Sequence, residues 1–430
     1  MLTGHRKDEL IAMMKAMLHH SFALDVMKQT VPDTFSHFED LIAEHCRDPE
    51  GSRLKQLVPS LGSFFHALPL RRAFEEYDAK YCITSRQFVA PTFNELRHIL
   101  NLAQVHALGR DAPDGDGQGL RFISFDGDET LYSHGENFSA DSKLARYIVK
   151  LLQHGVHVAL VTAAGYPHQA TKYEGRMSGL LQTFVELSLP VDVMSRFWVL
   201  GGECNYLFRC GADARLTEVP AESWLPQSTQ WPPEEITRVL DTAEASLRAT
   251  MAKLKIRGRV LRKERAVGII PGGKEGKQQQ PGGSGGKSIR RELLDELCLA
   301  VQHELSTGGF SIPYCAFNGG GDVFVDIGNK RVGVEGLMQY LELRPQQCLH
   351  VGDQFLNTGN DFSCRGACAT VWITNPTETK YILKRLLLAC GLSPKMDKGD
   401  DDRTPAEPPT PPPPSAATGD GSASKLTGTD

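Results

Sequence analysis

The chain has 430 residues, of which 40% are hydrophobic and 23% charged, and its formal net charge at pH 7 is −5. This length is enough for two or three domains with a large core, and the composition is ordinary for a soluble globular protein. The slight acidic excess argues against a protein that binds nucleic acid over its whole surface. We therefore expect a globular protein without a nucleic-acid partner.

No apolar stretch of the sequence approaches the ~20 residues that cross a bilayer, and residues 1–20 lack the uninterrupted apolar core of a signal peptide. Ten cysteines are scattered along the chain. Cys364 and Cys368 lie four positions apart, but no second pair of Cys or His lies near them, which argues against a zinc site. The sequence thus predicts a cytoplasmic protein with reduced thiols and no membrane contact.

Residues 1–115 are predicted to form a helical N-terminal region. Apolar residues recur every three or four positions in "DELIAMMKAMLHHSFALDVM", which is typical of an amphipathic helix. In "APTFNELRHILNLAQVHAL", Thr92 is followed three positions later by Glu95, the pattern of a capping box at the start of a helix.

From Arg121 onward, short apolar runs alternate with helical patterns. One such helix is expected in "SADSKLARYIVKLLQHG", with Ser139 as its N-cap and Gly155 just after its end. Strands that alternate with helices favour right-handed crossovers and a parallel α/β sheet. The predicted strands cover residues 121–125, 155–165, 348–354 and 369–374.

A different pattern interrupts this alternation and predicts an inserted domain at residues 166–310. It contains a long helix near 233–254 and a run rich in Gly and Gln at 271–288, which is typical of a flexible loop. The catalytic core is accordingly predicted at residues 116–165 together with 311–395. Residues 396–430 have the composition of a disordered tail.

Acidic residues follow two of the predicted strands. Asp126 and Asp128 come after "RFISF", and Asp353 and Asp361 lie in "HVGDQFLNTGNDF". Functional residues of such sheets sit at the carboxyl ends of the strands. Oxygen-only ligands favour Mg²⁺, and its charge would offset the repulsion between these acids. An ionised Asp126 beside the cation is then a competent nucleophile toward phosphorus, and Asp128 can act as acid and base.

Phosphoryl transfer also requires donors to the phosphoryl oxygens. Thr162, at the end of "VALVT", offers a hydroxyl, and Lys330, in "GGGDVFVDIGNKRVGV", offers a cation. Taken singly, these residues have ordinary explanations, since a lone D-x-D is usually a solvated turn and a lone Lys is usually on the surface. Their order along the chain, at the edge of one predicted sheet, favours the catalytic interpretation.

The chain resembles the haloacid dehalogenase superfamily of phosphatases, whose four motifs are those just described, over residues 118–165 and 310–390. Within it, residues 80–390 are similar to the IMP-specific 5′-nucleotidases of fungi and protozoa. Two features depart from the family pattern: His134 stands where an acid often precedes the glycine of "LYSHG", and the insert at 271–287 is peculiar to this chain. The similar strings are "APTFNELRHILNLAQ", "FDGDETLY", "GGECNYLF", "KERAVGIIP", "GDVFVDIGNK" and "HVGDQFLNTGNDF".

The resemblance implies a Rossmann-like parallel sheet of the haloacid dehalogenase type, with an inserted α+β cap and a helical N-terminal region. It also implies Mg²⁺-dependent hydrolysis of IMP to inosine and phosphate. Asp126 would be the nucleophile and Asp128 the general acid and base. The ion would be held by Asp126, the backbone carbonyl of Asp128 and Asp353, with Asp361 in support. Thr162 and Lys330 would bind the phosphoryl group.

Other residues are expected to bind the rest of the substrate and an effector. Asp322 and His134 would contact the nucleoside, and Tyr206 or Phe208 would stack on the base. The family is associated with activation by ATP and with tetramers, so an ATP effector and subunit contacts through the N-terminal helices are also implied. The residues expected to recognise the base are Glu203, Asn205 and Arg209, and those expected to bind the effector are His106, Asn357 and Phe362.

Two other functions are compatible with the sequence. The first is a haloacid dehalogenase-type phosphatase or phosphomutase that acts on another ester, such as a sugar phosphate. The second is a non-catalytic nucleotide-binding regulator, although every acid and the lysine needed for turnover are present.

Overall fold

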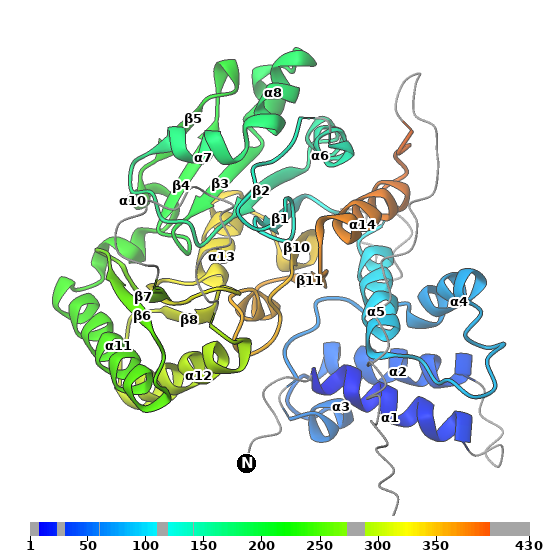
Figure 1. Cartoon of the computed structure of the whole chain (residues 1–430). Coiled ribbons are helices and arrows are strands. Elements are labelled where there is room, and N and C mark those ends of the chain that lie inside the picture. The colour runs from blue at the N-terminus through cyan, green and yellow to red at the C-terminus, as the bar shows by residue number, and fades with distance from the viewer. Residues whose placement is uncertain are drawn as a thin grey trace, which may run out of the picture. The chain divides into compact units, whose positions relative to one another are not determined.

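The computed structural model of the chain (Figure 1) describes most of the sequence. Most of the predicted flexible loop at 271–288 and the whole predicted tail at 396–430 lie outside the described residues. None of the described helices is long and apolar enough to cross a bilayer. The described residues are 8–23, 31–59, 61–109, 119–140, 142–272 and 289–395.

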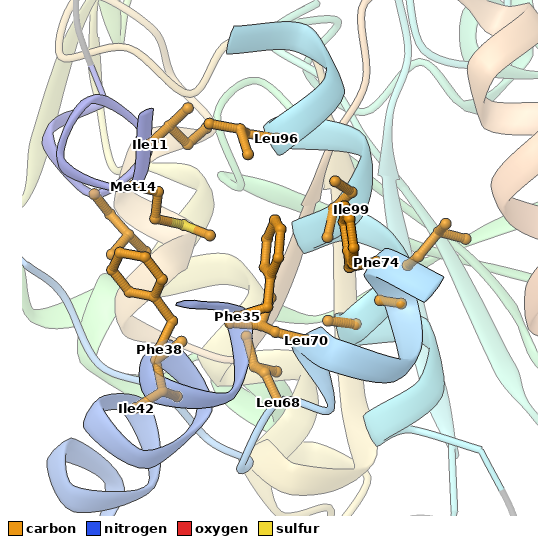
Figure 2. Close-up of a cluster of buried hydrophobic side chains, with 14 of the residues drawn as sticks. Ile11, Met14, Phe35, Phe38, Ile42, Leu68, Leu70, Phe74, Leu96 and Ile99 are labelled. Carbon is orange, nitrogen blue, oxygen red and sulfur yellow. The ribbon is translucent and has the colours of Figure 1, made fainter. Parts of the chain in front are cut away.

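The N-terminal region is helical in its described part, as predicted. Its helices enclose a cluster of buried apolar side chains, part of which is shown in Figure 2. Phe35 stacks on Phe74 at the centre of this cluster, with ring centroids 4.5 Å apart. Burying each such side chain contributes roughly 1.5–3 kcal/mol, which explains why these helices pack together. They are α1 (Glu9–Ala23), α2 (Val31–Arg47), α3 (Arg53–Leu57), α4 (Leu70–Tyr81) and α5 (Phe93–Ala107).

The predicted capping box at the start of α5 is confirmed. The Thr92 hydroxyl accepts a hydrogen bond from the Glu95 backbone N–H at 3.3 Å, and the Glu95 carboxylate accepts one from the Thr92 backbone N–H at 2.7 Å. Both bonds satisfy backbone donors that a helix start leaves without partners.

We expect Thr92→Ala to lower the free energy of unfolding by about 1 kcal/mol, because it removes this cap. Urea unfolding followed by circular dichroism would measure the change. Thr237→Ala is the matched control, since Thr237 lies exposed inside a helix and donates to the Pro233 carbonyl. The control should instead stabilise the chain by up to about 0.7 kcal/mol, because alanine has the higher helix propensity. Equal effects of the two changes would contradict the assignment of the cap.

The predicted parallel sheet is confirmed and is larger than expected. Seven strands pair in the order β11-β10-β1-β2-β3-β4-β5. The first five are mutually parallel, and β4 and β5 extend the sheet in antiparallel fashion. Strands β1, β3 and β10 are buried at every position. This burial is expected when helices cover both faces of a parallel sheet. The bounds are β1 Phe122–Asp126, β2 His157–Val161, β3 Phe197–Gly201, β4 Tyr206–Cys210, β5 Leu216–Val219, β10 Cys348–Gly352 and β11 Ala369–Trp372.

Helix α6 begins later than predicted. Its N-cap is Ser142, whose hydroxyl accepts from the Leu144 backbone N–H at 3.2 Å, so the prediction of Ser139 was wrong. Ser139 instead closes a preceding turn, where its carbonyl accepts from the Ser142 backbone N–H. Gly155 follows the helix end with φ +83°, as predicted. Other helices that accompany this sheet are α6 (Lys143–Gln153), α7 (Ala170–Arg176), α8 (Ser178–Glu186), α9 (Val191–Met194), α10 (Ala221–Trp224), α13 (Lys330–Tyr340) and α14 (Pro376–Ala389).

A second, antiparallel sheet has the strand order β6-β7-β9-β8. Two long helices pack on it and enclose a separate apolar core, and the predicted helix near 233–254 is one of them (Figure 1). The elements are α11 (Pro233–Leu254), α12 (Arg291–Thr307), β6 (Gly258–Arg262), β7 (Ala266–Pro271), β8 (Tyr314–Asn318) and β9 (Val323–Ile327).

The two sheets correct the predicted limits of the inserted domain. Strands β3 to β5 were assigned to an insert at 166–310, but they belong to the large sheet, because β3 pairs with β2 from Val158 and Phe197 onward. Strands β8 and β9 were assigned to the core, but they complete the second sheet. Trp224 packs in the core of the large sheet, whereas Trp231 packs against that of the second. Strand periodicity does not reveal which sheet a strand joins.

Candidate active site

Three predicted residues meet at the carboxyl edge of the large sheet. Asp126 is the last residue of β1, Thr162 follows β2 and Asp353 follows β10. All three line one cavity of about 280 Å³. Phe324 of β9 and Asp322, which directly precedes β9, line the same cavity. The cavity therefore lies between the sheet edge and the inserted sheet, where ligands of such folds bind.

Carboxylate oxygens of Asp126, Asp353 and Asp361 lie within 4.8 Å of one another. This closeness was required by the prediction that Asp126 and Asp353 share an ion. Burial, with the neighbouring Asp361 contributing, raises the pKa of Asp126 to about 7, and burial and Asp126 raise the pKa of Asp353 well above its usual range. The neighbouring carboxylates of Asp126 and Asp353, which repel each other in this site, fit a divalent cation.

Lys330 is fully buried at the start of α13. Its ammonium group donates to Oδ1 of Asp126 at 2.5 Å and to Oδ1 of Asp361 at 2.6 Å. Burial alone would lower the pKa of Lys330, but the two carboxylates raise it well above its ordinary value. The lysine is therefore charged and holds two acids of the site together.

Asp361 has hydrogen-bond partners on both of its carboxylate oxygens. Besides Lys330, its Oδ1 faces His350 Nε2 at 3.0 Å, and its Oδ2 accepts from the Gln354 backbone N–H at 2.9 Å. Burial opposes ionisation, but Lys330 and then His350 hold the pKa of Asp361 below its usual range. Asp361 thus orients its neighbours and has little capacity left for a cation.

Sequence reasoning missed two polar residues behind this site. His350 on β10 is fully buried, and its Nδ1 lies 2.9 Å from the hydroxyl of Ser124 on β1. Both residues interrupt buried apolar strands, in "ISF" and "LHVG", and a polar residue at such a position signals a hydrogen-bonded network.

Asp128 lies beyond the β1 turn and lines the cavity with about a third of its side chain exposed. Its Oδ1 accepts from the Gly135 backbone N–H at 3.1 Å. His134 Nδ1 lies 4.0 Å from this oxygen, and Arg176 Nη1, from α7, lies 3.8 Å from it. His134 also lines the cavity. Arg176 was not anticipated, because nothing in its local sequence marks it.

The residues predicted to recognise the base do not all line the cavity. Asn205 lines the cavity, and its Oδ1 accepts from Arg265 at 3.0 Å. Glu203 is fully buried and hydrogen-bonds to Asn360 at 2.7 Å without lining the cavity. Arg209 is exposed on β4 and donates to the Ser195 carbonyl. Neither Glu203 nor Arg209 lines the cavity, so the structure does not bring them together with Asn205 there.

Of the two aromatic residues predicted to stack on the base, one lines the cavity and the other does not. Tyr206 lines the cavity, whereas Phe208 is fully buried against Tyr173. Phe324 and Lys263, which sequence reasoning missed, also line the cavity and approach each other, with Nζ 5.4 Å from the ring centroid. Both come from the second sheet or its connecting turn, so their proximity depends on the pairing of β7 with β9.

A second cavity of about 310 Å³ lies against the N-terminal helices. Asn357 and Phe362, two of the predicted effector residues, line it, together with Arg365 and Trp372. His106 does not line it, because its Nε2 contacts Glu76 on α4 at 3.0 Å. The three predicted effector residues thus do not share one cavity.

A family model described as IMP-specific 5′-nucleotidase matches residues 1–383. The chain belongs to this family. An IMP-specific 5′-nucleotidase 1 from Plasmodium falciparum is 36% identical over 89% of the chain and 83% of the relative. One from Aspergillus fumigatus is 44% identical over 83% of the chain and 77% of the relative.

Solved structures of this nucleotidase family agree with the fold. A mutant of the IMP-nucleotidase of Plasmodium falciparum with bound IMP superposes with a TM-score of 0.81 at 36% identity, covering 89% of this chain and 94% of the other. An ATP-bound structure of the same enzyme has a TM-score of 0.76 and covers 88% of this chain and 84% of the other.

Proposed function

We propose that this chain hydrolyses IMP to inosine and phosphate through a phosphorylated Asp126. The observation that carries the proposal is the convergence of Asp126, Asp353 and Lys330 at the edge of one sheet, beside a cavity large enough for a nucleotide. Membership of the IMP-specific 5′-nucleotidase family supports the choice of substrate.

In the first step, an Asp126 oxygen attacks the phosphorus, and the bond from phosphorus to the 5′ oxygen of the nucleoside breaks. Asp128, which also lines the cavity, gives its proton to that oxygen, and inosine leaves. Lys330 holds Oδ1 of Asp126, which leaves Oδ2 as the attacking atom. Thr162 lines the cavity and offers a hydroxyl to the phosphoryl oxygens.

In the second step, water attacks the phosphorus of the phosphorylated Asp126. Asp128 takes the proton of this water, the bond from Asp126 to phosphorus breaks, and phosphate leaves. The contacts of Asp128 with the Gly135 N–H and the nearby Arg176 fix its carboxyl group at the same position for both proton transfers.

We propose Mg²⁺ as the cation. Asp126, Asp353 and the backbone carbonyl of Asp128 would hold it, and it would neutralise charge on the phosphoryl oxygens. Two of these three ligands lie close together within a buried acidic cluster, and their oxygen donors match the preference of this ion. Asp361 would orient Lys330 and the Asp353 loop instead of binding the ion, because Lys330 and Gln354 occupy its oxygens.

The nucleoside would lie toward the second sheet. Asp322, Asn205, His134 and Tyr206 line the cavity and offer polar and stacking contacts. Since the IMP-nucleotidase of Plasmodium falciparum has been solved with IMP and with ATP, we also propose a nucleotide effector in the second cavity, near Asn357 and Phe362. A tetramer stays a prediction.

Phosphate release from IMP, GMP, AMP and CMP, measured with and without Mg²⁺ and ATP, tests the proposal. We expect IMP to be hydrolysed fastest, and chelation with EDTA to abolish release until Mg²⁺ is restored. Hexose phosphates are the comparison for a sugar phosphatase, and their equal turnover would contradict nucleotide specificity. Binding of IMP without release of phosphate would indicate a non-catalytic regulator.

A further inference from the structure

Three consecutive residues fix the position of Asp353, and each uses a different partner. The Gly352 carbonyl accepts from the Ile373 backbone N–H at 2.9 Å. The Asp353 carbonyl accepts from the indole N–H of Trp372 at 2.9 Å. The following N–H, of Gln354, donates to Asp361 at 2.9 Å. Among the described residues, Trp372 is thus the side chain that donates to the Asp353 backbone.

Trp372 is itself held by the N-terminal helices. It ends β11, which is the edge strand of the large sheet, so one side of its backbone has no neighbouring strand. Asn101 of α5 takes that place: its Nδ2 donates to the Trp372 carbonyl at 2.6 Å, and its Oδ1 accepts from the Trp372 N–H at 3.0 Å. Arg97 donates to the same carbonyl at 2.6 Å.

Arg97 is anchored from the other side as well. Its guanidinium forms two hydrogen bonds with Glu378 of α14, at 2.8 and 3.0 Å, and both side chains are buried. A bidentate pair of this kind fixes the guanidinium plane. Helix α5 therefore presents a rigid pair of side chains to Trp372.

We propose that Trp372 is a positioning residue for Asp353, and that α5 acts on the metal site through it. The inference rests on the proposed function, in which Asp353 binds the cation. Loss of the indole N–H leaves the Asp353 carbonyl without this donor. The backbone that carries the Asp353 carboxylate is then less restrained. Partners one step removed from a ligand commonly tune metal affinity.

Replacing Trp372 by Phe tests this proposal, because the ring is kept and only the N–H is lost. Calorimetric titration of the full chain with Mn²⁺ alone should show metal affinity weakened by about tenfold. In turnover assays, excess metal should restore kcat, and KM for IMP at saturating metal should stay within about twofold of the unmutated value, because Trp372 does not line the substrate cavity.

Trp198→Phe is the matched control. Trp198 lies in the same sheet and is fully buried, whereas Trp372 is partly buried, and the Trp198 indole donates to His157 at 3.2 Å. The control should lose a comparable hydrogen bond and keep its metal affinity. Equal Mn²⁺ affinity in the two variants would overturn the proposal.

A second variant covers the case in which Trp372→Phe does not fold. Asn101→Ala removes both bonds to the Trp372 backbone and leaves the indole intact, and it should weaken Mn²⁺ binding in the same direction. Unchanged affinity in this variant would overturn the role of α5. Failure of the unmutated chain to hydrolyse IMP would refute the proposed function and not the inference, since the Mn²⁺ titration compares binding only.

Discussion

An Asp126→Asn variant is expected to release phosphate from IMP about 10⁴-fold more slowly or worse, because an amide cannot replace the attacking carboxylate. The substitution is nearly isosteric, and Lys330 keeps its second partner, Asp361, at 2.6 Å. We therefore expect the variant to fold and to bind IMP, so the loss should fall on kcat. Single-turnover phosphate release and equilibrium binding of IMP would separate the two effects.

Asp241→Asn is the control for this experiment. Asp241 is exposed on α11, pairs with Arg262 on β6 and does not line the cavity. Its replacement changes the charge of the chain by the same amount and should leave the rate within about twofold, as expected for surface changes. A rate for Asp126→Asn above about 1% of the unmutated rate would refute Asp126 as the nucleophile.

Lys330→Met is expected to lower the free energy of unfolding by about 3–5 kcal/mol and to abolish hydrolysis, because breaking a buried ion pair leaves charges uncompensated. Lys330 is fully buried, and both of its partners, Asp126 and Asp361, are also buried. Methionine keeps most of the side-chain volume, so a packing defect contributes little. Urea unfolding at neutral pH would measure the change in stability, and phosphate release would measure the activity.

The adjacent residue supplies the control. Arg331 pairs with Glu335 one helical turn later at 2.8 Å, with about half of its side chain exposed. Arg331→Met also removes one positive charge from α13 but should cost about 0.5 kcal/mol or less, since exposed pairs contribute little. Similar losses of stability from both substitutions would show that Lys330 is not a buried partner of the two acids.

The acids and the lysine could be predicted from sequence because each follows a recognisable strand or opens a helix. A strand brings its last residue to a defined edge, so Asp126, Thr162 and Asp353 were located by periodicity alone. Glu203 and Asn205 show that this reasoning does not predict which side chains of a turn reach the cavity. They are two positions apart in one turn, yet Glu203, with φ +50°, is fully buried while Asn205 lines the cavity.

Contacts between segments that are distant along the chain also could not be predicted from the sequence. The bond from Trp372 to the Asp353 carbonyl depends on the register in which Gly352 faces Trp372, and the clamp from Asn101 depends on the docking of α5 on the edge strand. Neither residue belongs to a motif with a chemical meaning of its own. Their roles arise from tertiary packing, which local patterns do not encode.

The connection between β9 and α13 determines how this enzyme could be re-engineered. Strand β9 ends at Ile327 and α13 begins at Lys330, so the inserted sheet and the buried lysine are joined by Gly328 and Asn329 alone. Gly328 has φ +89°, and a Cβ there would lie 2.9 Å from the Glu203 carbonyl, so the junction tolerates little change. A chimaera that exchanges the second sheet and its helices should therefore be spliced near Trp231 and should retain Gly328, since splicing at 166 and 310 would divide both sheets.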